Sequence, residues 1–206
     1  IKLLRNFEIS FLLGNSTRPI AGRDIVRHTS LTPFAMELTF VHQSFTVRAV
    51  YFTPPGEAGA FVLLAVESEE PLTVVCGFLP ALQPMWPAGI GGQYAFWDEK
   101  LHAYIISESA RRFHGLVGSP AAQGISYTPA HMLSETPNEF KIEIPNPATM
   151  KGKYIPIVLA GGQGGYATAG ELEADAFAKP HPIEIQRDLG RQVLQFEILV
   201  GLVAAG

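Results

Sequence analysis

The chain has 206 residues, of which 47% are hydrophobic and 17% are charged, which suits one large globular domain or a domain with an appendage. Its net charge of −4 provides no basic surface of the kind that nucleic-acid binding needs, so we expect no nucleic-acid partner. Cys76 is the only cysteine, which excludes an internal disulfide and a zinc site built on cysteine alone. Its place in the apolar run LTVVCGFL predicts a small buried hydrophobic residue.

The two ends of the sequence are unusual for a complete chain. It starts at Ile1 with no segment that resembles a secretory signal, and it finishes in the apolar run VLQFEILVGLVAAG. That run is too short to cross a bilayer and is interrupted by Glu197, so we expect no membrane association. We interpret the chain as a piece of a longer protein. Its cellular compartment stays open.

The first clear elements are strands. AMELTFVHQ and SFTVRAVYF alternate between apolar and polar residues and are rich in β-branched and aromatic side chains, which predicts two half-buried strands. AFVLLAVES and PLTVVCGFL are apolar runs joined by Glu69–Pro71, and we predict that they form a hairpin.

Further strands follow at short spacing. QYAFW and LHAYII flank Asp98–Lys100, which predicts a second hairpin. In EFKIEIP the alternation places Phe140, Ile142 and Ile144 inside the protein. Closely spaced strands without a helical period predict a mainly β fold, an antiparallel β-sandwich over residues 1–165.

From Tyr166 onward the residue pattern no longer indicates a series of strands. GELEADAFA contains helix formers, and the run that starts at Ile183 fits either a helix or a strand, because short apolar runs do not distinguish the two. We favour helix, so residues 166–206 are predicted to be a linker and a short C-terminal helical segment.

A glycine-rich loop at Gly162–Ala167 fits the pattern G-x-G-x-x-A that cradles a dinucleotide pyrophosphate. Against this reading, Pro156 lies in the strand that would precede the loop, and a central parallel strand needs every backbone amide. The segments upstream also read as antiparallel. We therefore favour a turn between domains and expect no cofactor.

No complete catalytic or metal-binding constellation is visible in the sequence. The six histidines are scattered, without metal-ligand spacing, and there is no nucleophile elbow. Asp98, Glu99 and Glu108 are close in sequence, and paired carboxylates can hydrolyse glycosidic bonds. A turn acid beside a lysine is usually solvated, so we predict no catalytic residue and no metal ligand.

The segment from Met85 to Ile106 is rich in aromatic residues, glycines and polar side chains. Flat aromatic faces stack on sugar rings, while amides and carboxylates bind hydroxyl groups. The candidate carbohydrate-binding or domain-docking residues are Trp86, Gln93, Tyr94, Trp97, Asp98 and His102. The same aromatic residues could instead fill the space between two sheets, and this alternative stays open.

A family resemblance adds to this reading. The run LQPMWPAGIGGQYAFWDEKLHAYIISESARRFHGLVGSPAA, with FTVRAVYFTPP and LLAVESEEPLTVV upstream, resembles the N-terminal β-sandwich domain of bacterial glycosidases. The family is that of amylo-α-1,6-glucosidase-like or glycogen-debranching-like (six-hairpin) enzymes, and the resemblance spans roughly residues 30 to 170. It implies a supersandwich-like domain followed in the same chain by an (α/α)6 barrel that carries the catalytic acid and base.

Three hypotheses follow. The first is a non-catalytic sandwich domain of a glycoside hydrolase acting on α-glucans, which supports the catalytic barrel and contacts an oligosaccharide. The second is a stand-alone carbohydrate-binding module. The third is a nucleotide-dependent oxidoreductase that uses the Gly162–Ala167 loop.

Overall fold

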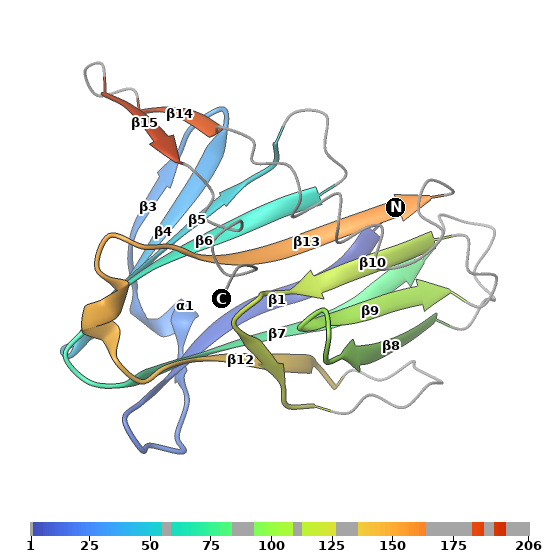
Figure 1. The fold of residues 1–206 in the computed structure, drawn as a ribbon, viewed down its shortest axis with the longest axis horizontal. Coiled ribbons are helices and arrows are strands. Elements are labelled where there is room, and N and C mark those ends of the chain that lie inside the picture. The colour runs from blue at the N-terminus through green and yellow to red at the C-terminus, as the bar shows by residue number, and fades with distance from the viewer. Residues whose placement is uncertain are drawn as a thin grey trace.

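The computed structural model describes residues 2–54, 59–83, 93–108, 113–126, 136–163, 183–187 and 192–196. Within these residues the regular structure is almost entirely β-strand, arranged in three antiparallel sheets (Figure 1). The elements are β1 (Lys2–Leu13), β2 (Ile20–Ala21), α1 (Gly22–Ile25), β3 (Val26–Leu31), β4 (Ala35–Val41), β5 (Phe45–Phe52), β6 (Gly59–Ser68), β7 (Leu72–Gln83), β8 (Gln93–Asp98), β9 (Ala103–Glu108), β10 (Phe113–Gly118), β11 (Ala122–Gly124), β12 (Asn138–Ile144), the 3-10 helix η1 (Pro147–Met150), β13 (Ile155–Gln163), β14 (Ile183–Arg187) and β15 (Gln192–Phe196).

The smaller of the two main sheets has the strand order β11-β12-β7-β1-β2. The long strand β1 pairs with β7 over most of its length, from Lys2 to Leu13. The register shifts between Arg5 and Glu8, and Asn6 there takes a positive φ of 53°. Extra residues in one strand disrupt the ladder of hydrogen bonds in this way, as in a β-bulge. The first residues of β1 are therefore offset from the rest of the strand in their pairing with β7.

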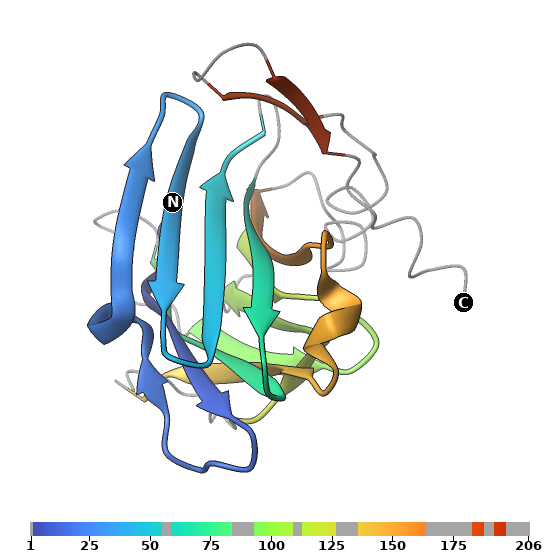
Figure 2. The ribbon, with the colours of Figure 1, turned by 90° about the vertical axis from the view of Figure 1, so that its left-hand side faces the viewer.

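The larger sheet has eight strands in the order β3-β4-β5-β6-β13-β10-β9-β8. Strands β3 to β6 form one antiparallel meander, and Figure 2 shows these four strands side by side. Strands β8 to β10 form a second meander, and β13 joins the two by pairing with β6 on one side and β10 on the other. The fold is an antiparallel β-sandwich, which confirms the predicted fold class.

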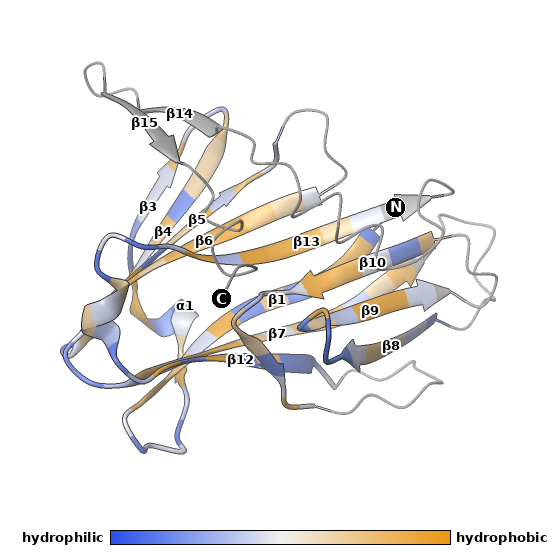
Figure 3. Cartoon of the chain, in the orientation of Figure 1, coloured by the Kyte–Doolittle hydropathy of each residue, from blue (hydrophilic) through white to orange (hydrophobic). Residues whose placement is uncertain are grey.

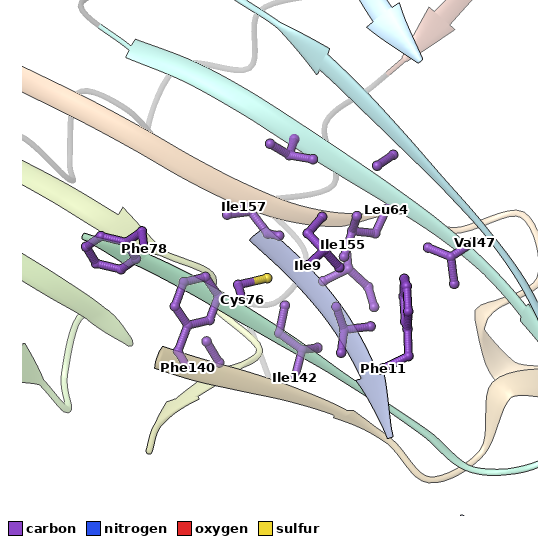
Figure 4. Close-up of a cluster of buried hydrophobic side chains, with 14 of the residues drawn as sticks. Ile9, Phe11, Val47, Leu64, Cys76, Phe78, Phe140, Ile142, Ile155 and Ile157 are labelled. Carbon is purple, nitrogen blue, oxygen red and sulfur yellow. The ribbon is translucent and has the colours of Figure 1, made fainter. Parts of the chain in front are cut away.

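The main core lies between these two sheets. Ile9, Phe11 and Cys76 from the five-stranded sheet point toward Val47 and Leu64 from the eight-stranded sheet, as Figure 4 shows. Apolar residues therefore run along the strands of both sheets (Figure 3). Cys76 is fully buried, as its apolar surroundings in the sequence predicted, and burial raises the pKa of its thiol well above the usual range.

The eight-stranded sheet is apolar on its other face as well. A second buried cluster there includes Phe52, Phe61 and Leu63 of β5 and β6, together with Leu116 and Val158. In β6 the consecutive residues 61–64 are all buried, because alternate side chains face the two clusters. Burial on both faces explains why AFVLLAVES reads as a continuous apolar run and not as an alternating one.

The predicted hairpin across Glu69–Pro71 is wrong, although both of its strands exist. β6 belongs to the eight-stranded sheet and β7 to the five-stranded sheet, so the chain crosses between layers. The link is held from both sides: the amide of Glu69 donates to the carbonyl of Ser44, and the amide of Gly14 donates to the carbonyl of Pro71. These bonds tie the crossing to a turn in one sheet and to the end of β1 in the other.

The helix favoured for the run that starts at Ile183 is also wrong for the residues described there. β14 and β15 form a two-stranded antiparallel sheet, with Ile183 opposite Phe196 and Arg187 opposite Gln192. The reason is visible in the sequence: IEIQR alternates apolar and polar residues with a period of two, which is the strand period. The boundary at residues 165 and 166 stays a prediction.

Two further predictions are confirmed. β8 and β9 pair as the hairpin predicted on either side of Asp98–Lys100. In β12 the side chains of Phe140, Ile142 and Ile144 are buried, while those between them face outward.

Candidate functional site

The β8–β9 hairpin carries five of the six predicted carbohydrate-binding residues, and it forms one edge of the eight-stranded sheet. Its turn is set by Asp98, whose Oδ1 accepts the backbone amides of Lys100 (2.9 Å) and Leu101 (3.2 Å). A short carboxylate side chain commonly caps a turn in this way. His102 completes the turn with a positive φ of 49°. Asp98 is therefore engaged in shaping the hairpin.

The inward face of β8 carries Trp97, which packs against the main core. Its ring lies 5.1 Å from the Tyr104 ring at 67°, and 6.5 Å from the Phe140 ring at 25°, measured between centroids. It also covers Gly124 of β11, where an added Cβ would come within 2.5 Å of the indole. Trp97 thus closes the space between the edge strands of the two sheets.

Gln93 points inward from the start of β8. Its Nε2 donates to the carbonyl of Pro80 in β7 at 2.9 Å, which links the two sheets. Its Oε1 is buried with no hydrogen-bond partner among the described residues, and the same holds for the Nε1 of Trp97 and for both amide atoms of Asn138. Unpaired buried polar atoms usually accept or donate to ordered water.

His102 and Tyr104 hold the hairpin to the opposite layer. The Nδ1 of His102 lies 3.0 Å from the carbonyl of Ala122, so this nitrogen carries the proton. The hydroxyl of Tyr104 lies 2.7 Å from the Ser126 carbonyl and 2.9 Å from that of Glu139. Burial raises the pKa of the Tyr104 hydroxyl above its usual value of 10.0.

The outward face of β8 carries Tyr94 and Phe96. Their ring centroids are 6.2 Å apart with planes inclined by 18°, and Phe96 is 47% exposed. The structure therefore divides the predicted set. Gln93 and Trp97 face the space between the sheets, Tyr94 faces outward beside Phe96, and Asp98 with His102 forms the turn; Trp86 lies outside the described residues.

The glycine-rich loop does not follow a parallel strand. Gly162 and Gln163 end β13, which is antiparallel to both of its neighbours, and residues 164–167 lie outside the described residues. A dinucleotide-binding unit needs a first strand with parallel neighbours, and β13 pairs antiparallel with both β6 and β10. Pro156 is tolerated because β10 pairs with β13 only as far as Val158, leaving one side of the strand open at the proline.

Other classes of site can be checked over the described part of the chain. There, no three His, Cys, Asp or Glu side chains gather closely enough to hold a metal ion. The described residues also contain no helix with the length and apolar character needed to span a bilayer.

Sequence reasoning missed a pocket of about 510 Å³ at one end of the eight-stranded sheet. It lies beside the β3–β4 turn, where Leu31 and Phe34 are 79% and 67% exposed. The signal in the sequence was SLTPF, in which two large apolar residues flank a Thr-Pro turn. Such a turn normally carries polar residues.

Comparisons with known proteins bear on the fold. No protein-family model matches the sequence, and no curated protein matches it significantly. Among solved structures, the chain is similar to a bacterial glucoamylase complexed with acarbose, with a TM-score of 0.52 and 9% identity. The match covers 86% of this chain and 29% of the glucoamylase chain. At this identity the similarity shows the fold alone: the sandwich resembles a part of that enzyme.

Proposed function

We propose that the chain is a non-catalytic β-sandwich domain of a glycoside hydrolase that acts on α-glucans. The observation that carries the proposal is the structural match to part of a bacterial glucoamylase, which extends over 86% of this chain. The sequence resemblance to the sandwich domain of glycogen-debranching-like enzymes supports the same assignment by a separate route.

In this proposal the chemistry belongs to a second domain of the same polypeptide, an (α/α)6 barrel. Glycoside hydrolysis uses two carboxylates that flank the scissile bond. Asp98, the acid nearest to the aromatic residues, is held by two backbone amides of its own turn. A carboxylate in that role has its charge directed into the turn, which favours a structural function.

A contact with carbohydrate would involve the outward side of the β8–β9 hairpin. Tyr94 and Phe96 present apolar ring surface there. Trp86 remains a candidate from the adjoining segment. Trp97 and Gln93 would act indirectly, because both hold the hairpin against the core.

The direct test is to express the complete reading frame and the 206-residue chain separately, and to measure glucose release from maltooligosaccharides and soluble starch. We expect hydrolysis by the complete protein and none by the 206-residue chain. Removing this chain from the complete protein should lower the temperature at which the remainder loses activity. Absence of α-glucan hydrolysis by the complete protein would refute the proposal.

A stand-alone carbohydrate-binding module is the second candidate, and the exposure of Phe96 on an edge strand favours it. Affinity electrophoresis of the 206-residue chain in starch gels tests it. Phe96→Ala should reduce the retardation, whereas Phe34→Ala, which removes an exposed ring at the β3–β4 turn, should not. Equal migration with and without starch would rule this candidate out.

A further inference from the structure

The long strand β1 is divided into two parts by the bulge near Asn6. Residues 8–13 pair with β7 in one unbroken register, and Ile9 and Phe11 among them are 6% and 0% exposed. Residues 2–5 pair with β7 across a second register shift, and none of them is buried. Packing and regular pairing determine how firmly a segment is held, so the two parts of β1 should differ in local stability.

The backbone pairing of the first part is weak for a chemical reason as well. Leu4 lies opposite Pro80 of β7, and proline has no amide hydrogen to donate to a neighbouring strand. The carbonyl of Pro80 accepts the Nε2 of Gln93 at 2.9 Å. Asn6, at the end of this part, takes a φ of 53°, which interrupts an extended strand. Pro80 therefore offers the first part of β1 fewer backbone hydrogen bonds than another residue would.

The side chain of Leu3 connects this first part to the opposite sheet. It lies against Gly115 of β10, where an added Cβ would overlap the Leu3 Cδ1. Gly161 of β13 is opposite Gly115 in the ladder, and an added Cβ there would lie 3.9 Å from the Leu3 Cδ2, which is an ordinary contact. Leu3 therefore occupies a notch that exists because residue 115 has no side chain.

We propose that residues 2–5 form a latch that opens and closes while the rest of the sandwich stays folded. The side chain of Leu3 holds the latch closed, and the bulge at Asn6 is its hinge. The closed latch pairs with residues 79–83 of β7. Among the described strands, β12 pairs with β7 only as far as Phe78, so opening leaves that end of β7 without a partner among them. The latch thus controls access to a strand edge, and a free edge is a template for pairing with another strand.

Hydrogen exchange of the 206-residue chain, followed amide by amide by NMR, tests the latch. We expect the amides of residues 2–5 to be protected but to exchange at a rate that low urea concentrations do not change, because a local opening exposes little surface. The amides of residues 9–13 should exchange only when the sandwich unfolds, at a rate that urea increases. Unprotected amides at residues 2–5 would overturn the inference, because the latch would then not close. A urea dependence shared by both parts would also overturn it, because β1 would then open as one unit.

Ile9→Val tests whether the two parts of β1 open independently. It weakens the packing of the second part alone, since Ile9 is buried in the main core. Exchange at residues 9–13 should become about fivefold faster, while residues 2–5 keep their wild-type rate. Equal acceleration in both parts would show that they open together and would overturn the inference.

Gly115→Ala tests the role of Leu3 from the opposite sheet, because its methyl group displaces the Leu3 side chain. Exchange at residues 2–5 should become about tenfold faster, and Leu3→Ala should have the same effect because it removes the side chain itself. Gly161→Ala is the matched control: its methyl group meets Leu3 only at an ordinary contact distance, so the exchange rate of residues 2–5 should not change. Equal acceleration by the two glycine variants, or an unchanged rate in Leu3→Ala, would refute the assignment of Leu3.

Discussion

Trp97→Ala tests whether the tryptophan of the β8–β9 hairpin is a core residue. The ring contacts Tyr104 and Phe140 and covers Gly124. Truncating a buried tryptophan to alanine costs about 3–5 kcal/mol. Trp97 is only partly buried, and its unpaired Nε1 offsets part of the gain from packing, so we expect a loss of about 2–3 kcal/mol. For a chain of this length that corresponds to a melting temperature lower by about 5–10 °C.

The assay is urea denaturation and thermal unfolding of the 206-residue chain, followed by circular dichroism. Phe96→Ala is the matched control, because it removes a ring one position away on the opposite face of the same strand. An exposed substitution of this kind should change the free energy of unfolding by less than about 0.5 kcal/mol. A Trp97→Ala variant as stable as wild type, but with reduced affinity for starch, would refute the core assignment and make Trp97 a binding residue.

Trp97→Phe separates the ring from its N–H group. The smaller ring keeps part of the contact with Tyr104 and removes a buried donor that has no partner among the described residues. We therefore expect it to cost about 1 kcal/mol or less, well below the loss for alanine. A loss as large as that of Trp97→Ala would show instead that the indole N–H is satisfied in solution, as it would be by an ordered water.

Three further predictions concern the same core. Gly124→Ala should cost about 1–3 kcal/mol and alter the near-ultraviolet circular dichroism, because the new Cβ would lie 2.5 Å from the Trp97 ring. Tyr104→Phe should cost about 1–3 kcal/mol in urea denaturation, since it removes a buried hydroxyl whose proton is donated to the nearby carbonyls of Ser126 and Glu139. The chain should also lose stability at alkaline pH. Burial raises the pKa values of Cys76 and Tyr51 above their ordinary values of 9.0 and 10.0. As the pH rises, the unfolded chain therefore releases these protons before the folded chain does, which favours unfolding. Cys76→Val and Tyr51→Phe should flatten the fall in unfolding free energy above about pH 9, and an unchanged pH dependence in both variants would contradict the assigned cause.

The sequence predicted individual strands better than their partners. Alternation in EFKIEIP identified the buried side of β12, and the Asp98 turn identified the β8–β9 hairpin, because both signals depend on neighbouring residues. The β6–β7 connection carries an equally clear turn signal, yet its strands pair with β13 and β12, which lie far along the chain. A turn shows where the chain changes direction, and long-range packing decides which sheet the next strand joins.

The sequence likewise predicted where the candidate site lies along the chain, but not which of its side chains face the surface. Composition identified the aromatic hairpin, but it could not separate the two faces of β8. Residues 94 and 96 face outward and residues 93 and 97 face inward, so successive side chains of this strand alternate between the surface and the core. Which face is the core face depends on where the five-stranded sheet lies, and that is a tertiary property. The pocket beside Leu31 and Phe34 was invisible for the same reason, since its lining comes from strands far apart in sequence.

The eight-stranded sheet connects these observations to the proposed role. One of its faces packs on the five-stranded sheet, and the other carries a second buried apolar cluster around Phe61 and Leu116. A sheet that is apolar on both faces behaves as an inner layer of a protein, as in sheets covered on both sides. Phe52 and Phe61 belong to that second cluster, so their rings lie on the face of the sheet opposite to Tyr51 and Leu159. In the proposed function this chain is one domain of a larger enzyme, and a sheet with two buried apolar faces suits a place inside such a protein.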